Sequence, residues 1–394
     1  MIVITGGGTG GHLAIARALA QELHKRKIPA IYIGSLYGQD QMWFGQRLES
    51  NELDSSSTGK SGELFQECYF LNTSGVVNKK GFKKLASIYA QLRAVWGVRK
   101  IFAKHGVQAV ISVGGFSAGP ASLAAIMLKK PLFIHEQNAI QGRLNSLLSP
   151  FAKAVFNSFH PPFPPYPIKQ EALQRRRIRT KFQSIIFIGG SQGAKAINDL
   201  ALQVAPKLLA RGIHIIHQCG ERDLDRVRQV YMELDSSLLD ARESVSLASS
   251  SVQYPSTTPR LTLFGFDKDL IKHLAKADIC IARAGASSVW ENVALSLPTI
   301  YIPYPYAANN HQYHNASYFT RQGLGLMITE QELHKLEANP KESLESTLDL
   351  AKFFALLSQL ESNLTEISTA LSQVITTNGA ESITTDIMQA LARK

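Results

Sequence analysis

The residues best suited to chemistry stand at the start of the chain, in Ile2-Val-Ile-Thr-Gly-Gly-Gly-Thr-Gly-Gly-His12. Four residues typical of a buried strand lead into a glycine loop, and Leu13–Glu22 behind it is typical of a helix. Glycine lets a backbone approach a ligand closely, and a helix N-terminus presents N–H groups without intrahelical acceptors and a partial positive charge. This geometry suits a phosphate or a diphosphate.

The same succession of strand, glycine-rich turn and helix occurs again later in the chain. Ile185-Ile-Phe-Ile-Gly-Gly-Ser-Gln-Gly-Ala194 repeats it before a helix expected from Lys195 to about Ala210. Gly114-Gly-Phe-Ser-Ala-Gly-Pro120 is a further glycine loop. Many single turns of this kind bind nothing, so it is the repetition that favours a binding function.

The loop Arg283-Ala-Gly-Ala-Ser-Ser-Val-Trp-Glu291 is the most informative of the set. It follows a strand and enters a helix near Ser287, so the N–H groups of Ala286, Ser287 and Ser288 are expected to face a diphosphate. Glu291 comes one turn into the helix, where a carboxylate can accept hydrogen bonds from both ribose hydroxyls. The alternative for Glu291 is an ordinary acid on a helix surface.

Two nucleotide-binding classes lack the residues that they require. A dinucleotide dehydrogenase needs an acid at the end of its second strand, and Ala30-Ile-Tyr-Ile-Gly-Ser35 has none. The Gly-x4-Gly-Lys-Ser/Thr string of a P-loop enzyme is absent from the sequence. Asp223-Leu-Asp225 and Asp267-Lys-Asp269 could carry a metal-bound nucleotide, but we interpret both as solvated helix faces in charge-rich stretches. We therefore predict neither a metal nor a cofactor.

Apolar strand segments alternate with helical stretches, which predicts parallel sheets with crossover helices. The expected strands are Ile2–Thr5, Ala30–Ile33, Glu67–Leu71, Ala109–Val113, Leu132–His135, Ala154–Phe156, Ser184–Ile188, His214–Gln218, Leu261–Phe264, Ile279–Ala282, Thr299–Ile302 and Gly325–Ile328. The proline-rich His160–Pro167 between the two series is expected to be a stiff linker. The sequence thus predicts two doubly wound, Rossmann-like α/β domains facing each other across a cleft. Their predicted limits are 1–160 and 184–370, with a basic linker at 161–183 and a terminal helix at 371–394.

Composition narrows the class of protein. The chain has 394 residues and a net charge of +11, and 45% of its residues are hydrophobic. It lacks an uninterrupted apolar run of about 18 residues and opens directly on a strand, so we expect neither a membrane span nor a signal peptide. Cys68, Cys219 and Cys280 match no zinc or disulfide spacing, which favours a reducing, cytoplasmic setting. The positive charge suits nucleic acid, an anionic membrane or an anionic substrate, and the sequence carries no nucleic-acid-binding motif.

The segment Val77–Lys100 is a candidate for membrane contact. Its apolar residues at helical spacing are Phe82, Leu85, Tyr89, Leu92 and Trp96. The basic residues around them are Lys79, Lys80, Lys83, Lys84, Arg93, Arg99 and Lys100. A basic helix with such a stripe can lie on an anionic membrane, whereas most such stripes pack into a core. We expect part of this stripe to pack inward and the end with Lys79, Lys80, Phe82, Lys83 and Lys84 to touch the bilayer.

Six motifs stand in the order found in one enzyme family. They are Gly-Gly-Gly-Thr-Gly-Gly-His12, Gly114-Gly-Phe-Ser-Ala-Gly-Pro120, His135-Glu-Gln-Asn138, Gly189-Gly-Ser-Gln-Gly-Ala194, Arg283-Ala-Gly-Ala286 and Asn310-His-Gln312. Over nearly its full length the chain resembles the bacterial glycosyltransferases that form lipid II, the UDP-N-acetylglucosamine–N-acetylmuramyl-(pentapeptide) pyrophosphoryl-undecaprenol N-acetylglucosamine transferases. The resemblance implies a two-domain GT-B fold and an inverting transfer of N-acetylglucosamine from UDP-N-acetylglucosamine to lipid I. It also implies a peripheral location on the cytoplasmic face of the inner membrane.

The same resemblance implies roles for residues of the C-terminal, donor-binding domain. Ser191 and the loop Ala286–Ser288 would contact the diphosphate, and Glu291 the ribose. Phe266, after the strand Leu261–Phe264, would cover the uracil.

Other residues would surround the donor sugar. Gln312, with His311 beside it, would contact the sugar hydroxyls. The N-terminal domain, which would also take the lipid acceptor, would close over the sugar with Thr9, Gly10, Gly11 and Asn138. Lys169 stands where the family has a donor-binding arginine, and Ile15 where it often has a proline.

The transfer needs a base for the proton of the acceptor hydroxyl and groups that stabilise charge growing on the diphosphate. His12 is the candidate base because it stands on the glycine loop and titrates near neutrality. Helix capping or phosphate binding is the alternative role for His12, and Glu136 is the second candidate base. Two rival functions are a UDP-N-acetylglucosamine 2-epimerase, which needs no lipid surface, and a UDP-sugar-binding protein, which does not need His12.

Overall fold

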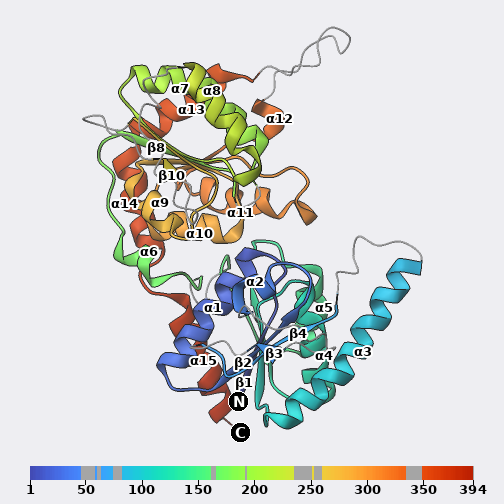
Figure 1. Cartoon of the computed structure of the whole chain (residues 1–394). Helices are drawn as coiled ribbons and strands as arrows, with labels where there is room; N and C mark the ends of the chain where they lie inside the picture. The colour runs from blue at the N-terminus through green and yellow to red at the C-terminus, as the bar shows by residue number, and fades with distance from the viewer. Residues whose placement is uncertain are drawn as a thin grey trace. The chain divides into compact units, whose positions relative to one another are not determined.

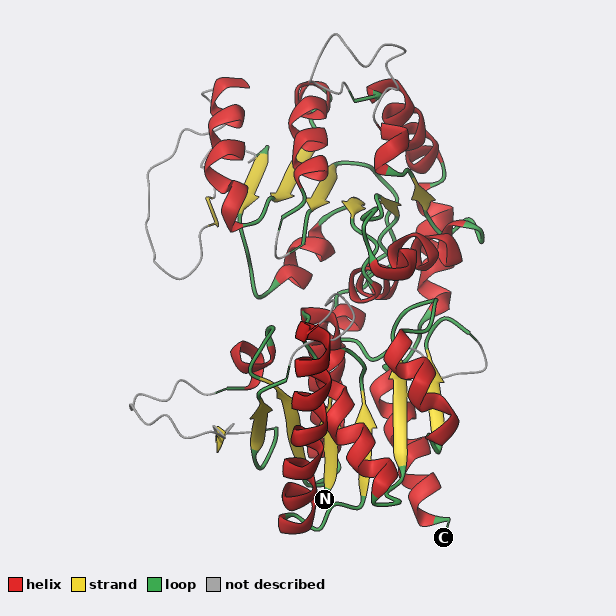
Figure 2. Ribbon diagram, turned by 90° about the vertical axis from the view of Figure 1, so that its right-hand side faces the viewer, coloured by secondary structure: helices red, strands yellow, loops and turns green. Residues whose placement is uncertain are grey.

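The computed structural model describes residues 1–45, 58–59, 64–73, 82–160, 166–190, 193–234, 251–252, 260–333 and 348–393. Of these, residues 58–59, 82–88, 90, 92 and 251–252 are described in their backbone alone. Within these ranges the chain forms two compact units. Unit 1 comprises residues 1–169 and 377–394, and unit 2 comprises residues 170–376. Each has one sheet flanked by helices, which confirms the predicted α/β fold class (Figure 2).

The sheet of unit 1 has the order β3-β4-β2-β1-β5-β6-β7. Its strands are β1 (Ile2–Thr5), β2 (Ala30–Ser35), β3 (Thr58–Gly59), β4 (Cys68–Leu71), β5 (Ala109–Ser112), β6 (Leu132–Glu136) and β7 (Ala154–Asn157). All pair in parallel except the short β3, which is antiparallel to β4. Its helices are α1 (Gly10–Lys25), α2 (Asp40–Phe44), α3 (Phe82–Lys104), α4 (Gly119–Met127), α5 (Arg143–Leu148) and α15 (Gly379–Ala392).

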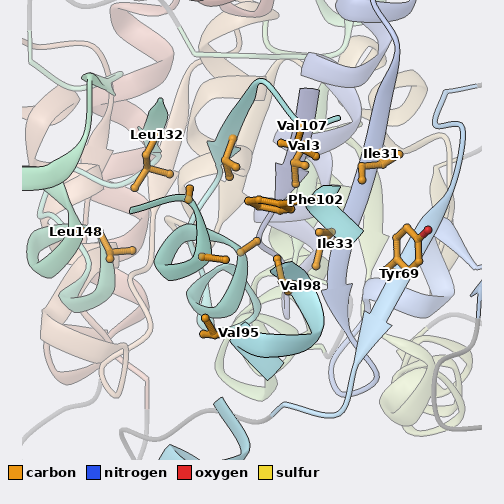
Figure 3. Packing of buried hydrophobic residues seen from close by; sticks show 14 of the residues in the cluster. Val3, Ile31, Ile33, Tyr69, Val95, Val98, Phe102, Val107, Leu132 and Leu148 are labelled. Carbon is orange, nitrogen blue, oxygen red and sulfur yellow. The ribbon is translucent and has the colours of Figure 1, made fainter. Parts of the chain in front are cut away.

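The core of unit 1 lies between this sheet and the helices α3 and α4 (Figure 3). Val3, Ile31 and Ile33 point from the strands toward Val98 and Phe102 of α3, and all are buried. Because side chains alternate along a strand, the neighbours of Val3 face the other side of the sheet, where α1 packs. Such two-sided burial explains why the strands are apolar throughout.

The C-terminal helix α15 belongs to unit 1 and packs along α1 (Figure 1). Asn378 caps it by accepting from the Ala380 N–H. The same side chain exchanges two hydrogen bonds with the backbone of Ile168. These contacts place the docking site of the terminal helix, which the sequence leaves open, on the N-terminal unit.

The sheet of unit 2 has the order β10-β11-β9-β8-β12-β13-β14. Its strands are β8 (Ser184–Ile188), β9 (His214–Gln218), β10 (Ser251–Val252), β11 (Leu261–Phe264), β12 (Ile279–Ala282), β13 (Thr299–Tyr301) and β14 (Leu326–Met327). Among the described strands of this second sheet, only β10 is antiparallel to its neighbour. Its helices are α6 (Gln170–Gln174), α7 (Lys195–Ala210), α8 (Leu224–Leu234), α9 (Leu270–Lys276), α10 (Ala286–Ala294), α11 (His311–Thr320), α12 (Glu330–Leu333), α13 (Leu350–Ser362) and α14 (Leu364–Val374).

The predicted limits of β1, β8, β9, β11 and β12 agree with the structure to the residue. The first helix was predicted wrongly at its N-terminus, because α1 already begins at Gly10. Helix propensity counts against glycine in a helix interior, but the first turn has few intrahelical hydrogen bonds to lose. Gly10, Gly11 and His12 therefore lie on the first turn of α1. None of the helices in the described ranges has the length and apolar content that a membrane crossing requires.

The basic part of the predicted linker is built into unit 2. Arg179 is fully buried, and its guanidinium donates to the carbonyls of Ala277 and Leu295, near the ends of α9 and α10. Arg176 donates to the carbonyl of Ala294 and Arg177 to that of Ala275. Burial, reinforced by the charge of Arg177, lowers the pKa of Arg179 to about 9, so the guanidinium remains charged at neutral pH. These arginines neutralise the carbonyl ends of helices, where cations are favourable.

Replacing the guanidinium of Arg179 should destabilise unit 2. Arg179→Met leaves buried carbonyl groups without donors, and we expect the free energy of unfolding to fall by about 2 to 4 kcal/mol. Urea unfolding followed by circular dichroism and tryptophan fluorescence measures this loss. The control is Arg175→Ala in the same segment, where an exposed ion pair with Glu171 contributes about 1 kcal/mol or less. Equal losses in the two variants would contradict a special role for Arg179.

Candidate active site

The glycine loops lie where the winding of each sheet changes direction. In unit 1, β1 stands between β2 and β5, so the loops after β1 and β5 lie next to each other at the carboxyl ends of their strands. In unit 2 the corresponding pair are the loops after β8 and β12. Ligands of open α/β sheets bind at this topological switch point. The fold thus brings together in each unit the loops that the sequence marks as candidates.

In unit 1 the two loops touch through their backbones. The Gly7 N–H donates to the Gly114 carbonyl at 3.1 Å. Gly115 has a φ of +80°, and a Cβ atom there would lie 2.1 Å from the Gly7 carbonyl oxygen. Only glycine satisfies both constraints, so this contact explains the glycines as packing requirements as well as ligand contacts.

The loop after β1 is held by a residue that the sequence analysis missed, Asp40 at the start of α2. Asp40 is fully buried, and its Oδ2 accepts from the Gly8 N–H at 2.6 Å. Its Oδ1 accepts from the Ser35 N–H at 3.1 Å and from the Tyr32 hydroxyl at 3.0 Å. Burial, with the adjacent charge of Asp40, raises the pKa of Tyr32, which keeps this hydroxyl a donor. No pattern in the sequence marks Asp40, because its partners come from two other segments, the loop after β1 and the strand β2.

His12, the candidate base, is half-buried on the first turn of α1. Its Nδ1 lies 2.8 Å from the Thr9 hydroxyl oxygen, and its Nε2 lies 2.8 Å from the amide nitrogen of Gln137. Thr9 is the exposed N-cap of α1, and its side chain makes no capping hydrogen bond. The geometry therefore groups Thr9, Gly10, Gly11 and His12 with the segment that follows β6.

Glu136, the second candidate base, is engaged by its own segment. Its Oε1 accepts from the backbone and side-chain nitrogens of Asn138, and its Oε2 from the Gly142 N–H and the Asn145 amide. The carboxylate is buried, so these donors satisfy its oxygens and shape the turn that carries Gln137 and Asn138. This arrangement favours a structural role for Glu136 over proton transfer.

In unit 2 the loop after β8 is a second tight glycine turn. The Gly193 N–H donates to the Gly190 carbonyl at 2.9 Å, and both glycines have positive φ, +73° and +80° respectively. The turn leads into α7, whose N-cap Ala194 offers no side-chain acceptor. Ser191, the predicted diphosphate contact, lies outside the described residues.

The loop after β12 is fixed by α11. The Ala284 N–H donates to Oε1 of Gln312 at 3.2 Å, and the Ala284 carbonyl accepts from Asn315 at 3.1 Å. Arg283 donates to the Ile302 carbonyl and forms an ion pair with Glu330. These contacts hold the start of α10 rigid without using its N-terminal N–H groups.

Helix α10 carries the predicted diphosphate and ribose residues. It begins at Ala286, and its N-cap Gly285 has no side chain with which to cap it. Ala286 is buried, whereas Ser287, Ser288 and Glu291 are half-buried. Ser287 and Ser288 stand on the first turn and Glu291 begins the second, the order that a diphosphate followed by a ribose requires.

The predicted sugar contacts begin α11. Asn309 and Asn310 both have left-handed backbone angles, φ +49° and +53°, which asparagine tolerates better than most residues. The resulting turn introduces His311 and Gln312. Oε1 of Gln312 accepts from the Ala284 and Tyr304 N–H groups, so the group left to face a sugar hydroxyl is its NH2.

Two predicted residues remain, Phe266 and Lys169. Phe266 follows β11, and 40% of its surface is exposed, as a ring that stacks on a base requires. The sheet order places β11 two positions from β8. Lys169 is half-buried and is the last residue of unit 1 before the chain enters unit 2.

The two Asp-x-Asp strings are engaged by neighbouring side chains. Asp223 pairs with Arg226 and accepts from Asn198, and Asp267 contacts His273 at 2.7 Å. Asp267 precedes α9 in a turn, so its predicted place on a helix face was wrong. In the part of the chain that the structure describes, no group of three His, Cys, Asp or Glu residues could hold a metal ion.

A fold of two α/β units with paired loops at their switch points is compatible with two-domain nucleotide-sugar glycosyltransferases, and the family models identify that class. Residues 2–157 match the glycosyltransferase family 28 N-terminal domain, and residues 184–353 match its C-terminal domain. A protein of Helicobacter hepaticus, named UDP-N-acetylglucosamine–N-acetylmuramyl-(pentapeptide) pyrophosphoryl-undecaprenol N-acetylglucosamine transferase, is 46% identical over 97% of each chain. The chain belongs to this transferase family.

Solved structures support the same fold. The crystal structure of MurG from Acinetobacter baumannii is 25% identical, covers 99% of each chain and has a TM-score of 0.67. A UDP-GlcNAc 2-epimerase from Neisseria meningitidis, bound to UDP-GlcNAc, is 13% identical over 100% of each chain with a TM-score of 0.55. At that identity the epimerase supports the fold alone.

The stability of the first glycine loop should depend on the Asp40 side chain. Asp40→Asn places an NH2 group against N–H or O–H donors, and we expect unit 1 to lose about 2 to 3 kcal/mol of unfolding free energy. Denaturant unfolding measures the loss. The control is Asp386→Asn on the exposed face of α15, which makes the same chemical change and should alter stability by less than about 0.5 kcal/mol. An Asp40 variant as stable as the control would contradict this account of the loop.

Proposed function

We propose that the chain transfers N-acetylglucosamine, with inversion, from UDP-N-acetylglucosamine to undecaprenyl-pyrophosphoryl-N-acetylmuramyl-pentapeptide (lipid I), forming lipid II for peptidoglycan. The observation that carries this proposal is the 46% identity, along 97% of the chain, to an enzyme named for this transfer. The loops at both switch points supply the groups that the reaction requires. Inversion follows if the acceptor hydroxyl attacks the anomeric carbon directly while UDP leaves from the opposite face.

Unit 2 is the donor-binding unit in this proposal. The uracil stacks on the exposed ring of Phe266, and the ribose hydroxyls donate to Glu291. The diphosphate accepts from the first-turn N–H groups at Ala286, Ser287 and Ser288, and from Ser191. Charge that grows on the leaving diphosphate is stabilised by the positive end of α10, with the loop after β8 adding further N–H donors.

Unit 1 supplies the acceptor side of the reaction. His12 takes the proton of the attacking hydroxyl, which becomes the oxygen of the new glycosidic bond. The sugar is enclosed by Thr9, Gly10, Gly11 and Asn138 from this unit and is read by Gln312 and His311 from unit 2. Lys169 adds a positive charge for the diphosphate.

We find no residue of the chain that specifically favours the alternative function, a 2-epimerase. An epimerase would act on the donor alone and would need neither a lipid acceptor nor a basic amphipathic surface. The similarity to the epimerase structure, at 13% identity, is a similarity of fold.

A transfer assay tests the proposed function. With lipid I and UDP-N-acetylglucosamine labelled in the sugar, we expect the label to move to the lipid fraction, and His12→Ala to lower the turnover about 100-fold or more. UDP binding, measured by calorimetry, should be unchanged in His12→Ala because the proposed UDP contacts lie in unit 2. Label found as UDP-N-acetylmannosamine would support epimerisation instead. Near-normal turnover of His12→Ala would exclude His12 as the base.

We infer further that unit 1 docks on the anionic, cytoplasmic face of the cell membrane through the lysine-rich N-terminal end of α3, with Tyr89 and Trp96 extending this surface along the helix. Tyr89 and Trp96, the members of the predicted stripe whose side chains are described, are 69% and 63% exposed, so neither packs inward as part of the stripe was expected to. The residues of α3 that pack inward are Val95, Val98 and Phe102, on another face of the helix. Arg99 lies over the Trp96 ring at 4.6 Å. An exposed aromatic stripe beside cations is the pattern of an interfacial helix. Lys79 and Lys80 lie outside the described residues, and for Phe82, Lys83 and Lys84 the structure gives the backbone of α3 alone.

Vesicle binding tests this contact. We expect co-sedimentation with vesicles that contain anionic phospholipid, and a loss of at least about tenfold in affinity when Lys79, Lys80, Lys83 and Lys84 are all replaced by glutamine. The control removes four exposed lysines of unit 2, namely Lys181, Lys195, Lys207 and Lys272. Vesicle binding that does not depend on anionic lipid, or that falls equally in both variants, would contradict the proposed docking through this surface.

A further inference from the structure

A chain of hydrogen bonds links the candidate base to the segment that leaves unit 1. The Tyr166 hydroxyl donates to Oε1 of Gln137 at 3.3 Å. Nε2 of Gln137 lies 2.8 Å from Nε2 of His12, and Nδ1 of His12 lies 2.8 Å from the Thr9 hydroxyl oxygen. Gln137 and Tyr166 are buried, whereas Thr9 is exposed.

The direction of these hydrogen bonds follows from the chemistry of the amide. The Tyr166 hydroxyl occupies the acceptor oxygen of Gln137, so the amide turns its NH2 toward His12. An NH2 group can only donate, so Nε2 of His12 must hold a lone pair. The proton of the neutral imidazole then sits on Nδ1 and is donated to the Thr9 oxygen.

The same arrangement disfavours the doubly protonated imidazole. An imidazolium would turn an N–H donor against the NH2 of Gln137, and it would stand at the positive end of α1. The titratable side chains nearest in the chain to Gln137 are His135 and Glu136 on β6. Burial, with a smaller effect of His12, lowers the pKa of His135 to about 3, so His135 is neutral, and Glu136 is satisfied by its own donors. Tyr166, beyond Gln137, contributes a hydroxyl that donates to the amide oxygen.

Tyr166 itself is held in place by the chain around it. Its carbonyl accepts from the Gly379 N–H, and Ile168, two residues later, is hydrogen-bonded to Asn378. Its ring meets the ring of His135 edge to face at 5.8 Å. The far end of the hydrogen-bond chain is therefore anchored by α15 and β6 rather than by solvent.

We propose that Gln137, oriented by Tyr166, is a positioning residue that keeps His12 neutral with its lone pair on Nε2. The amide holds the place of the acceptor hydroxyl. When the acceptor hydroxyl replaces the Gln137 amide, its O–H group donates to Nε2 of His12 as the amide N–H did. The imidazole therefore needs no change of tautomer before it takes the proton. As a base-positioning role, this inference rests on the function proposed above, whereas the protonation state of His12 can be tested without it.

The first test is nitrogen-15 NMR of the histidine side chains, with the His12 signals assigned by their loss in His12→Ala. In the wild type we expect a protonated Nδ1 and an unprotonated Nε2 at neutral pH. Gln137→Glu places an acceptor there instead, so we expect the proton on Nε2 and a His12 pKa higher by about 1 to 3 pH units. An unchanged tautomer and titration in Gln137→Glu, or a protonated Nε2 in the wild type, would overturn the proposal.

The second test is the pH dependence of kcat. Activity needs neutral His12 and is lost as the pH falls through its pKa, so a raised pKa moves this acidic limb to higher pH. We expect the limb of Gln137→Glu to move upward by about one pH unit or more, which is about tenfold in activity on the acidic side. Gln137→Met keeps the size of the side chain without the hydrogen bond, and should lower kcat by about two- to tenfold without that upward movement.

Two controls separate the possible failures. Gln21→Glu adds the same charge on the exposed face of α1 and should leave the acidic limb in place. An acidic limb that stays in place in Gln137→Glu, or moves equally in Gln21→Glu, would overturn the positioning role. A wild type that transfers no sugar would count against the proposed function, and the NMR experiment would still decide the role of Gln137.

Discussion

The site depends on one packing constraint, the close approach of two backbones at the switch point of a parallel sheet. In unit 1 the loops after β1 and β5 meet through the hydrogen bond from Gly7 to Gly114, where a side chain on Gly115 would collide with the Gly7 carbonyl. The His12 ring fills the space beside Gly114, 3.3 Å from the position of a Cβ atom. A side chain at position 114 would press on this ring and shift it relative to Gln137. The glycines therefore set the position of an imidazole as well as leaving room for a ligand.

Much of the fold could be predicted because parallel strands buried on both faces are apolar runs bounded by turns. β8 and β12 follow this rule, and their limits were predicted to the residue. The supports of the site could not be predicted in the same way. Asp40 and Tyr166 act through hydrogen bonds to segments far away in the chain, and no local pattern records those partners. For Glu136 the sequence gives the carboxyl group but not the four donor hydrogen bonds that satisfy it.

The basic residues behind the net charge of +11 fall into two groups with different surroundings. The first group is Arg176, Arg177 and Arg179, which donate hydrogen bonds to carbonyl groups within unit 2. Their guanidinium groups stabilise the C-terminal ends of helices and are therefore engaged within the unit. Arg99 lies instead beside the exposed Trp96 ring of α3. A sum of charges treats these residues alike, although only the second kind can attract an anionic surface. The structural support for the membrane proposal is therefore the pairing of Arg99 with the exposed Trp96 ring, and not the total charge.

An amide partner for His12 has a physical advantage over the carboxylate found beside many catalytic histidines. A carboxylate would strengthen the base, but it would also favour the imidazolium and place a negative charge where unit 1 is proposed to take a pyrophosphate-bearing acceptor. The carboxylate next in the chain, Glu136, is surrounded by N–H donors of its own turn, which disperse its charge. Gln137 fixes the tautomer through hydrogen-bond direction alone. The base is thus oriented without a fixed charge that would repel the acceptor, and its own proton acceptor atom stays covered until a hydroxyl takes the place of the amide.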